Sequence, residues 1–409
     1  MRVVILKIGL VSRVFGTAER VLQIANSLAG QGIEVVLSGA MENDLKALNP
    51  LHFKVIEAPR TILKLHSVLR WFAKLLVESG GADIVQIESL DFDNFSNSLS
   101  TFVRSFTLFL LLRPFRAKFI IVLHDKCFQQ DPRKSIGGKL NLFLQKILLT
   151  IFDASITPGS SLKRWFEELH GELASEKMVV IPNGAPDLVI GRDFDNLRLR
   201  EKYKVDSNAF LALFFGAMDF KPNYDAALHL YNISDPISQE FEKETGKNLA
   251  FIIAGKDTEV LPKSDCYIPL GFVKELDELL SLPDVIVLPH LPSFSGPHVK
   301  TMYAFLSNKP VIATADAVKD MPGVTPREQF LPFDINTSAT LLGCLTELYY
   351  DKHLCGSLAL NARLYAQNLS WKAVALMHIR LYEQLLLNKR LNSGANQDFP
   401  LPKLENTRC

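Results

Sequence analysis

Residues 3–37 read VVILKIGLVSRVFGTAERVLQIANSLAGQGIEVVL, and this stretch carries the pattern that decides the fold. The apolar run 3–6 is followed by a glycine-containing loop and then by apolar residues at helical spacing, namely Val21, Ile24, Ala25 and Leu28. Thr17 is suited to cap this helix and Gly30 to end it. A second apolar run follows at 34–37. The stretch therefore predicts a strand, a helix and a second strand, which is the repeating unit of a parallel sheet.

The same alternation continues along the chain in two sets. The first set predicts strands at 84–87, 119–123, 154–156 and 179–181, and the second at 211–215, 250–254, 267–270, 285–288 and 310–313. A polar interval at 191–205 separates the two sets and is the predicted linker. We therefore expect an α/β protein of two Rossmann-like, doubly wound parallel-sheet domains, at 1–190 and 191–370. The segment 371–390 is expected to pack back on the first domain as a helix, and 391–409 to form a flexible tail.

The overall composition excludes several classes of protein. Lys plus Arg number 45 and Asp plus Glu 44, so the chain lacks the positive field that drives nucleic-acid binding. The N-terminal apolar run is too short for a signal peptide, and the apolar stretch 106–123 is interrupted by Arg113, Arg116 and Lys118. The five cysteines are scattered and form no metal-binding pattern. These features predict a cytoplasmic protein with reduced thiols, no metal site and no membrane span.

The carboxyl ends of the predicted strands hold the main candidate site residues. Ligands of doubly wound sheets bind beyond these ends, so we expect the two domains to face a central cleft there. His124 directly follows the strand 119–123, and its imidazole can hydrogen-bond a sugar hydroxyl or a phosphate. Ser295-Gly-Pro-His-Val-Lys300 lies at a predicted helix start, where backbone amides, the Lys300 ammonium and the His298 ring suit a pyrophosphate. A purely structural helix start is the alternative.

Glycines mark further candidate contacts with a nucleotide. Gly16 and Thr17 lie where the first helix begins, which is half of a phosphate-binding loop without the spacing of a dinucleotide site. Gly216, Gly255 and Gly271 each follow a predicted strand and allow a ligand to approach the backbone closely. Gly255 and Gly271, with the adjacent Phe272 and Val273, are candidates to frame a base. Ordinary turns explain these residues almost equally well, and Ile181-Pro-Asn-Gly184 by itself predicts a turn.

Taken in order, these motifs resemble family 4 of the retaining GT-B glycosyltransferases over nearly the whole chain. The similar segments are Gly16-Thr-Ala-Glu-Arg20, Val122-Leu-His-Asp125, Ile181-Pro-Asn-Gly184 and Lys309-Pro-Val-Ile-Ala-Thr314. Residues 216–226 are similar to a subgroup with Gly-x-Met-Asp-x-x-Pro-Asn-x-Asp-Ala. The resemblance implies the GT-B fold, with an acceptor bound by the N-terminal domain and a nucleotide sugar by the C-terminal domain.

The resemblance also implies a reaction. A sugar would be transferred from a nucleoside-diphosphate sugar, with a UDP-sugar the donor most expected from the resemblance, to a glycan, a lipid-linked molecule or another acceptor. The anomeric configuration would be retained, and no metal or other cofactor would take part. Lys300 and His298 would stabilise the departing diphosphate, and His124 would contact the transferred sugar. The remaining donor-site positions would be Ser295, Gly296, Pro297 and Tyr303. The family usually carries Glu in place of Ser295 and of Tyr303, and a hydroxyl binds a ribose more weakly than a carboxylate does.

Other functions remain open on the sequence. The same fold serves sugar-nucleotide epimerases and phosphorylases, and a non-catalytic binding or scaffold subunit would explain the absence of the two acidic residues. The stretches 104–118 and 134–146 alternate apolar residues with Lys and Arg. This pattern favours either peripheral contact with an anionic membrane or a half-buried helix with a solvated face.

Overall fold

The computed structural model describes residues 1–11, 16–41, 52–58, 65–88, 102–103, 105–107, 109–110, 113, 117–124, 132–186, 194–292 and 299–388. The chain forms two compact units. The first contains the residues up to Gly184 together with those from Trp371 onward, and the second contains the described residues between Ala185 and Ser370. Within the described ranges, no helix is long and apolar enough to cross a bilayer.

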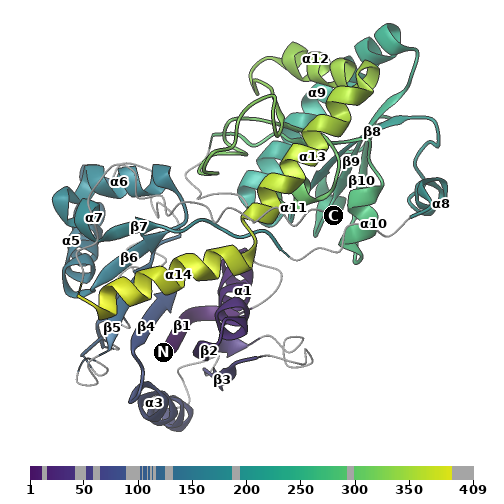
Figure 1. Ribbon diagram of the computed structural model, residues 1–409. Helices are drawn as coiled ribbons and strands as arrows, with labels where there is room; N and C mark the ends of the chain where they lie inside the picture. Colours follow the sequence, from purple (N-terminus) through teal and green to yellow (C-terminus); the bar gives the residue numbers. More distant parts are fainter. Residues whose placement is uncertain are drawn as a thin grey trace. The chain divides into compact units, whose positions relative to one another are not determined.

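The first unit is built on a seven-stranded parallel sheet in the order β3-β2-β1-β4-β5-β6-β7 (Figure 1). Its strands are β1 (Arg2–Val11), β2 (Glu34–Met41), β3 (Lys54–Glu57), β4 (Ile84–Glu88), β5 (Lys118–Val122), β6 (Ala154–Thr157) and β7 (Met178–Val180). The strand order reverses between β1 and β4, which pair from Val3 with Ile84 to Lys7 with Glu88. Such a reversal opens a crevice beyond the carboxyl ends of the two strands, where ligands of doubly wound sheets bind.

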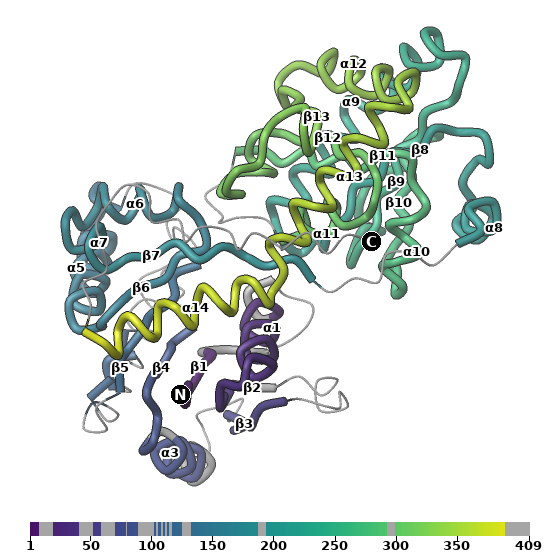
Figure 2. The backbone as a smooth tube through the Cα atoms, in the orientation of Figure 1, coloured from purple at the N-terminus to yellow at the C-terminus, as the bar shows by residue number. Residues whose placement is uncertain are grey.

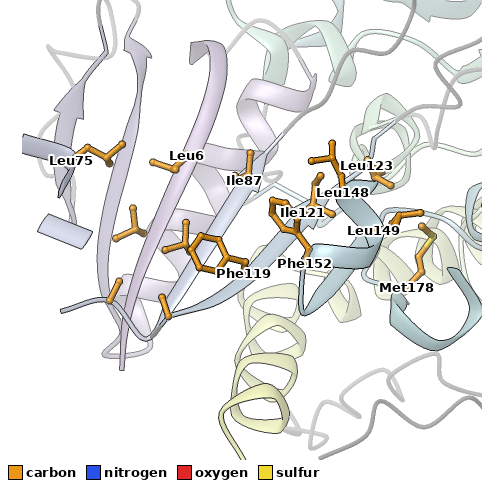
Figure 3. Close-up of a cluster of buried hydrophobic side chains, with 14 of the residues drawn as sticks. Leu6, Leu75, Ile87, Phe119, Ile121, Leu123, Leu148, Leu149, Phe152 and Met178 are labelled. Carbon is orange, nitrogen blue, oxygen red and sulfur yellow. The ribbon is translucent and has the colours of Figure 1, made fainter. Parts of the chain in front are cut away.

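Helices bury the apolar faces of this sheet. They are α1 (Gly16–Gly30), α3 (Leu65–Ser79), α5 (Ile136–Ile151), α6 (Ser160–His170) and α7 (Glu172–Lys177), with the short 3-10 helix η2 (Pro132–Lys134) before α5. The core between β5 and α5 is aromatic and aliphatic (Figure 3). The rings of Phe119 and Phe152 meet edge to face there, with centroids 6.1 Å apart. Leu148 and Leu149 of α5 are buried in the same core, which fixes the face of this helix that points inward.

The second unit contains a six-stranded parallel sheet in the order β10-β9-β8-β11-β12-β13 (Figure 2). Its strands are β8 (Phe210–Phe215), β9 (Leu249–Ala254), β10 (Tyr267–Gly271), β11 (Val285–Leu288), β12 (Val311–Ala313) and β13 (Leu331–Pro332). The helices are α8 (Asn196–Lys202), α9 (Lys221–Thr245), η3 (Thr258–Val260), α10 (Leu276–Ser281), α11 (Val299–Leu306), α12 (Ser338–Tyr350) and α13 (Lys352–Asn368). The order reverses between β8 and β11, which places a second crevice at the carboxyl ends of these strands.

The last described helix, α14 (Trp371–Leu386), belongs to the first unit. It packs against α1, as Figure 1 shows, and its Tyr382 hydroxyl donates a hydrogen bond of 2.7 Å to Gln86 Oε1 in β4. Both Trp371 and Tyr382 are fully buried. The C-terminal helix is therefore an integral part of the N-terminal core.

The structure confirms the predicted fold class, and the differences from the sequence analysis are local. Strands β3 and β13 were not predicted, and α1 begins at Gly16, so Thr17 lies inside the helix and does not precede it as a cap. The predicted linker 191–205 contains α8, whose Arg200 is buried and donates to the carbonyl oxygens of Asp206 and Ala209. These bonds and the ion pair of Arg200 with Asp284 fix α8 to the second unit.

Candidate functional site

Lys300 lies at the carboxyl end of β8, where the strand order of the second unit reverses. It lies on the first turn of α11, and its ammonium donates to the side-chain oxygen of Asn223 and, at 3.2 Å, to the carbonyl oxygen of Phe215 at the end of β8. The Nζ atom also lies 4.9 Å from the ring centroid of Phe214. Among the described residues, no carboxylate forms an ion pair with it. Burial lowers the pKa of Lys300 to about 7, because protein atoms replace the water around the charge.

Two glycines make room for this ammonium. A Cβ atom on Gly216 would lie 2.5 Å from Lys300 Nζ and 2.8 Å from Asn223 Nδ2, and one on Gly255 would lie 2.0 Å from the Gly216 carbonyl oxygen. The Gly216 and Gly255 amides donate to the carbonyls of Ala254 and Gly271, each at 2.9 Å. Their N–H groups are thus engaged in the protein. The structure gives these glycines a local reason, which is the close packing of the strand ends around Lys300.

Asn223 was not among the predicted site residues, but the structure gives it a direct role. It is buried in the first turn of α9, where it accepts a hydrogen bond from Lys300 and donates one of 2.8 Å to the Ala217 carbonyl. Pro222 precedes it at the helix start, as the sequence indicated. The Pro-Asn pair therefore orients the lysine as well as beginning a helix.

The end of β10 presents an aromatic surface beside these glycines. Gly271 has a φ of 81°, which favours glycine, and its amide donates to Thr258 Oγ1 at 2.9 Å. The next residue, Phe272, has 69% of its side chain exposed, and Val273 is half-buried. An exposed aromatic ring on an ordered strand end can stack on a nucleobase.

In the first unit, His124 lies beyond β5 and contacts a buried carboxylate. Its Nε2 is 2.9 Å from Glu88 Oε2, at the carboxyl end of β4, and both side chains are buried. Burial alone would raise the pKa of Glu88, but the hydrogen bond and charge of His124 and the charge of Arg20 outweigh it and hold that pKa at about 2. Glu88 is therefore a carboxylate that accepts a hydrogen bond from His124 Nε2–H, which leaves Nδ1 as the ring nitrogen for other partners.

Arg20 links two of the motifs found in the sequence. It is fully buried and donates to the Pro182 carbonyl at 2.9 Å, to the Asn183 side chain at 2.8 Å and to the Ile181 carbonyl at 3.2 Å. Residues 181–184 do not form the predicted turn, and the backbone oxygens of Ile181 and Pro182 and the side-chain oxygen of Asn183 accept hydrogen bonds from this guanidinium. Gly184 is small for a different reason: a Cβ there would lie 2.5 Å from Trp371 Cδ2.

The structure brings some of the predicted site residues together and places others apart. The structure brings Lys300 together with Gly216 and Gly255, with Gly271 on the adjoining strand. Tyr303 is half-buried on α11, and the backbones of Gly16 and Thr17 form the first turn of α1. The predicted positions Ser295, Gly296, Pro297 and His298 lie outside the described residues. In the described ranges, no group of three or more His, Cys, Asp or Glu side chains could hold a metal ion.

Sequence reasoning missed Glu88, Arg20 and Asn223. The sequence carried one signal for Glu88. Gln86 and Glu88 are two residues apart in the otherwise apolar strand β4, so they lie on the same face of the sheet. Arg20 and Asn223 stand in quoted motifs, but one sequence does not show which polar residues of a motif become buried.

Comparison with known proteins supports the two-unit architecture. Residues 15–184 match the family described as the glycosyl transferase 4-like domain. No curated protein sequence matches the chain. Among solved structures, HepE of Anabaena in complex with UDP and glucose is similar with a TM-score of 0.67 and 15% identity, over 94% of this chain and 100% of that one.

Two further solved structures show the same likeness. Sucrose-phosphate synthase of Thermosynechococcus elongatus has a TM-score of 0.65 and 16% identity, over 95% of this chain and 100% of its own. WaaG, a glycosyltransferase involved in lipopolysaccharide biosynthesis, has a TM-score of 0.62 and 14% identity, over 93% and 99% of the two chains. At these identities the likeness establishes the fold, which is GT-B.

Proposed function

We propose that this protein is a glycosyltransferase that moves a sugar from a nucleoside-diphosphate sugar to a glycan or lipid-linked acceptor, with retention of anomeric configuration. The observation that carries the proposal is the ammonium of Lys300. The Lys300 side chain is half-buried, its ammonium lies among neutral oxygens at a strand-order reversal, and the loss of water around it holds its pKa at about 7. A buried cation without a carboxylate partner gains most from an anionic ligand, because the anion restores the interaction lost with water.

A diphosphate fits this requirement better than other anions. In a sugar nucleotide the diphosphate is the leaving group, and negative charge develops on it as the glycosidic bond breaks. A preorganised ammonium stabilises that charge more in the transition state than in the ground state, which accelerates the reaction without a metal or other cofactor. In this proposal His298 assists Lys300, Phe272 stacks on the base, and His124 hydrogen-bonds a sugar hydroxyl through Nδ1 while Glu88 holds its other nitrogen.

The match of residues 15–184 to a glycosyl transferase 4-like domain supports this assignment. The complexes of HepE with UDP and with UDP-glucose support a uridine nucleotide as the first ligand to test. The acceptor is proposed from the sequence resemblance alone.

The test is a calorimetric titration of the purified chain with UDP, GDP, ADP and their common sugar conjugates. We expect one nucleotide series to bind, and Lys300→Met to weaken it by about tenfold or more, because a charge-assisted contact is lost. Lys263→Met is the matched control, since Lys263 is an exposed lysine of the same unit. Equal binding by Lys300→Met and the control would contradict the assigned role of Lys300.

A non-catalytic binding subunit is the second candidate, and one observation favours it. The helix α11 (Val299–Leu306) contains no carboxylate, and Tyr303 stands where the resembling family usually has Glu. Nucleotide binding without turnover over a panel of donors and acceptors would favour this candidate. Conversion of the sugar nucleotide to its epimer, detected by chromatography, would instead indicate an epimerase.

A further inference from the structure

Helix α5 exposes an unusual face to solvent. Ile136 is 89% exposed, Phe143 59% and Leu140 39%, and their spacing places them in one stripe along the helix. Lys139 and Lys146 are exposed beside the stripe. At 100° per residue these five side chains occupy a sector of roughly 120°. We call this set the α5 face.

The opposite side of α5 is held firmly by the core of the first unit. Leu144, Leu148 and Leu149 are buried in the core of the first unit. Gly138 packs directly on η2, because a Cβ there would lie 2.1 Å from the Pro132 carbonyl oxygen. This contact places the exposed Lys134 next to the start of α5. The helix therefore presents a fixed apolar stripe with basic residues along one side and at one end.

The lysines at the start of α5 do not stabilise the helix. No acidic residue occurs in α5, and its basic residues include Lys139 in the first turn and a lysine just before the helix. Cations near a helix N-terminus are unfavourable, because the macrodipole is positive there. Among the described residues, Lys134, Lys139 and Lys146 form no ion pair, not even with the exposed Glu172 and Glu176 of the neighbouring α7.

We propose that the α5 face docks this protein on the surface of an anionic lipid bilayer. Ile136, Leu140 and Phe143 enter the boundary between headgroups and acyl chains, and the lysines contact lipid phosphates. An interfacial helix combines an apolar stripe with flanking lysines in this way. A second copy of the chain fits less well, because an antiparallel two-fold pairing of the α5 faces would bring the lysines of one copy against those of the other. The inference does not depend on the proposed reaction.

The experiment is co-sedimentation of the full chain with vesicles of phosphatidylcholine alone and of an equimolar mixture with phosphatidylglycerol. We expect binding to the mixed vesicles, and weak or no binding to phosphatidylcholine. The double variant Leu140→Ser with Phe143→Ser should lower the partition coefficient by about tenfold or more. The double variant Lys139→Gln with Lys146→Gln should lower it by a similar factor on mixed vesicles, because each lysine contributes near an anionic surface.

Matched controls alter the same residue types in the second unit. Leu360 and Leu364 are 54% and 49% exposed on α13, and Lys243 and Lys263 are exposed lysines. Leu360→Ser with Leu364→Ser, and Lys243→Gln with Lys263→Gln, should bind vesicles like the wild type. Thermal unfolding of every variant checks that the fold is retained. The proposal is overturned if the wild type ignores mixed vesicles, if the α5 variants bind like the controls, or if sedimentation velocity shows that the α5 face holds a dimer.

Discussion

The pKa of Lys300 leads to a quantitative prediction about pH. Only the protonated ammonium attracts a diphosphate, and burial holds its pKa at about 7 in the ligand-free protein. A bound diphosphate should raise that pKa, because an opposite charge favours the charged form. Binding should therefore be strongest below about pH 7 and should weaken as the pH rises, with the uptake of a proton by Lys300.

The magnitude follows from the protonated fraction. With a pKa of about 7, roughly nine-tenths of the lysine is charged at about pH 6 and roughly one-tenth at about pH 8. The affinity for UDP-glucose should thus fall about tenfold over this interval, which is about 1.4 kcal/mol. UDP-glucose is the suitable probe because its diphosphate has no proton to lose in this range. At about pH 8, binding should take up roughly 0.9 proton.

Isothermal titration calorimetry measures both quantities. The affinity is determined at several pH values, and the proton uptake comes from the difference in heat between two buffers of different ionisation enthalpy. Lys300→Arg is the control, because a guanidinium stays charged throughout this range and removes the pH dependence that Lys300 supplies. A decline caused by histidines would persist in this variant.

Two results would refute the reasoning. Constant affinity of the wild type between about pH 6 and pH 8 would mean that Lys300 remains charged or does not meet the ligand. A tenfold decline that persists unchanged in Lys300→Arg would assign the titration to another group.

Three further predictions concern the first unit and the helix interiors. The pKa of Glu88 is held at about 2, so its carboxylate contributes stability that is complete above about pH 4.5 and is lost as the pH falls toward 2. In urea unfolding, the difference in stability between wild type and Glu88→Gln should therefore shrink over this interval by up to about 3 kcal/mol. A difference that stays constant would speak against this role of Glu88. Gly184→Ala should lower the free energy of unfolding by about 1–3 kcal/mol, because its Cβ would meet a tryptophan ring at 2.5 Å. Gly343→Ala, in open space within α12, should raise the free energy of unfolding by about 0.5–1 kcal/mol. Thermal unfolding of the two variants distinguishes these outcomes. Tyr382→Phe removes a buried hydrogen bond of 2.7 Å and should cost about 1–2 kcal/mol in denaturant unfolding, with an unchanged midpoint as the contrary outcome.

The order of the strands along the chain was predictable because short apolar runs report local burial. Strands such as β8 and β9 are buried at every residue, and their sequences are continuously apolar. The two missed strands fail this condition. β3 is an edge strand with two exposed residues in four, and β13 is an edge strand of two residues. A strand that is covered on one side only carries too few apolar residues to stand out.

The candidate site was predictable only in part, because its chemistry depends on contacts between distant residues. The position of Lys300 at a helix start was readable from the sequence, but its pKa of about 7 arises from burial, and its partners Asn223 and the Phe215 carbonyl come from distant segments. The choice of glycine at position 216 likewise depends on an ammonium from α11 and not on its own strand.

By itself, the sequence determined that this protein has two doubly wound parallel sheets, because hydrophobic periodicity is a local property that each segment carries alone. Only the tertiary structure determined which charged groups meet inside these domains and which protonation state they hold. Glu88 and His124 are 36 residues apart and Arg20 and Asn183 are 163 apart, yet each pair meets within 3 Å in the first unit. Burial away from water sets the protonation and strength of such groups, and burial is a property of the folded chain as a whole.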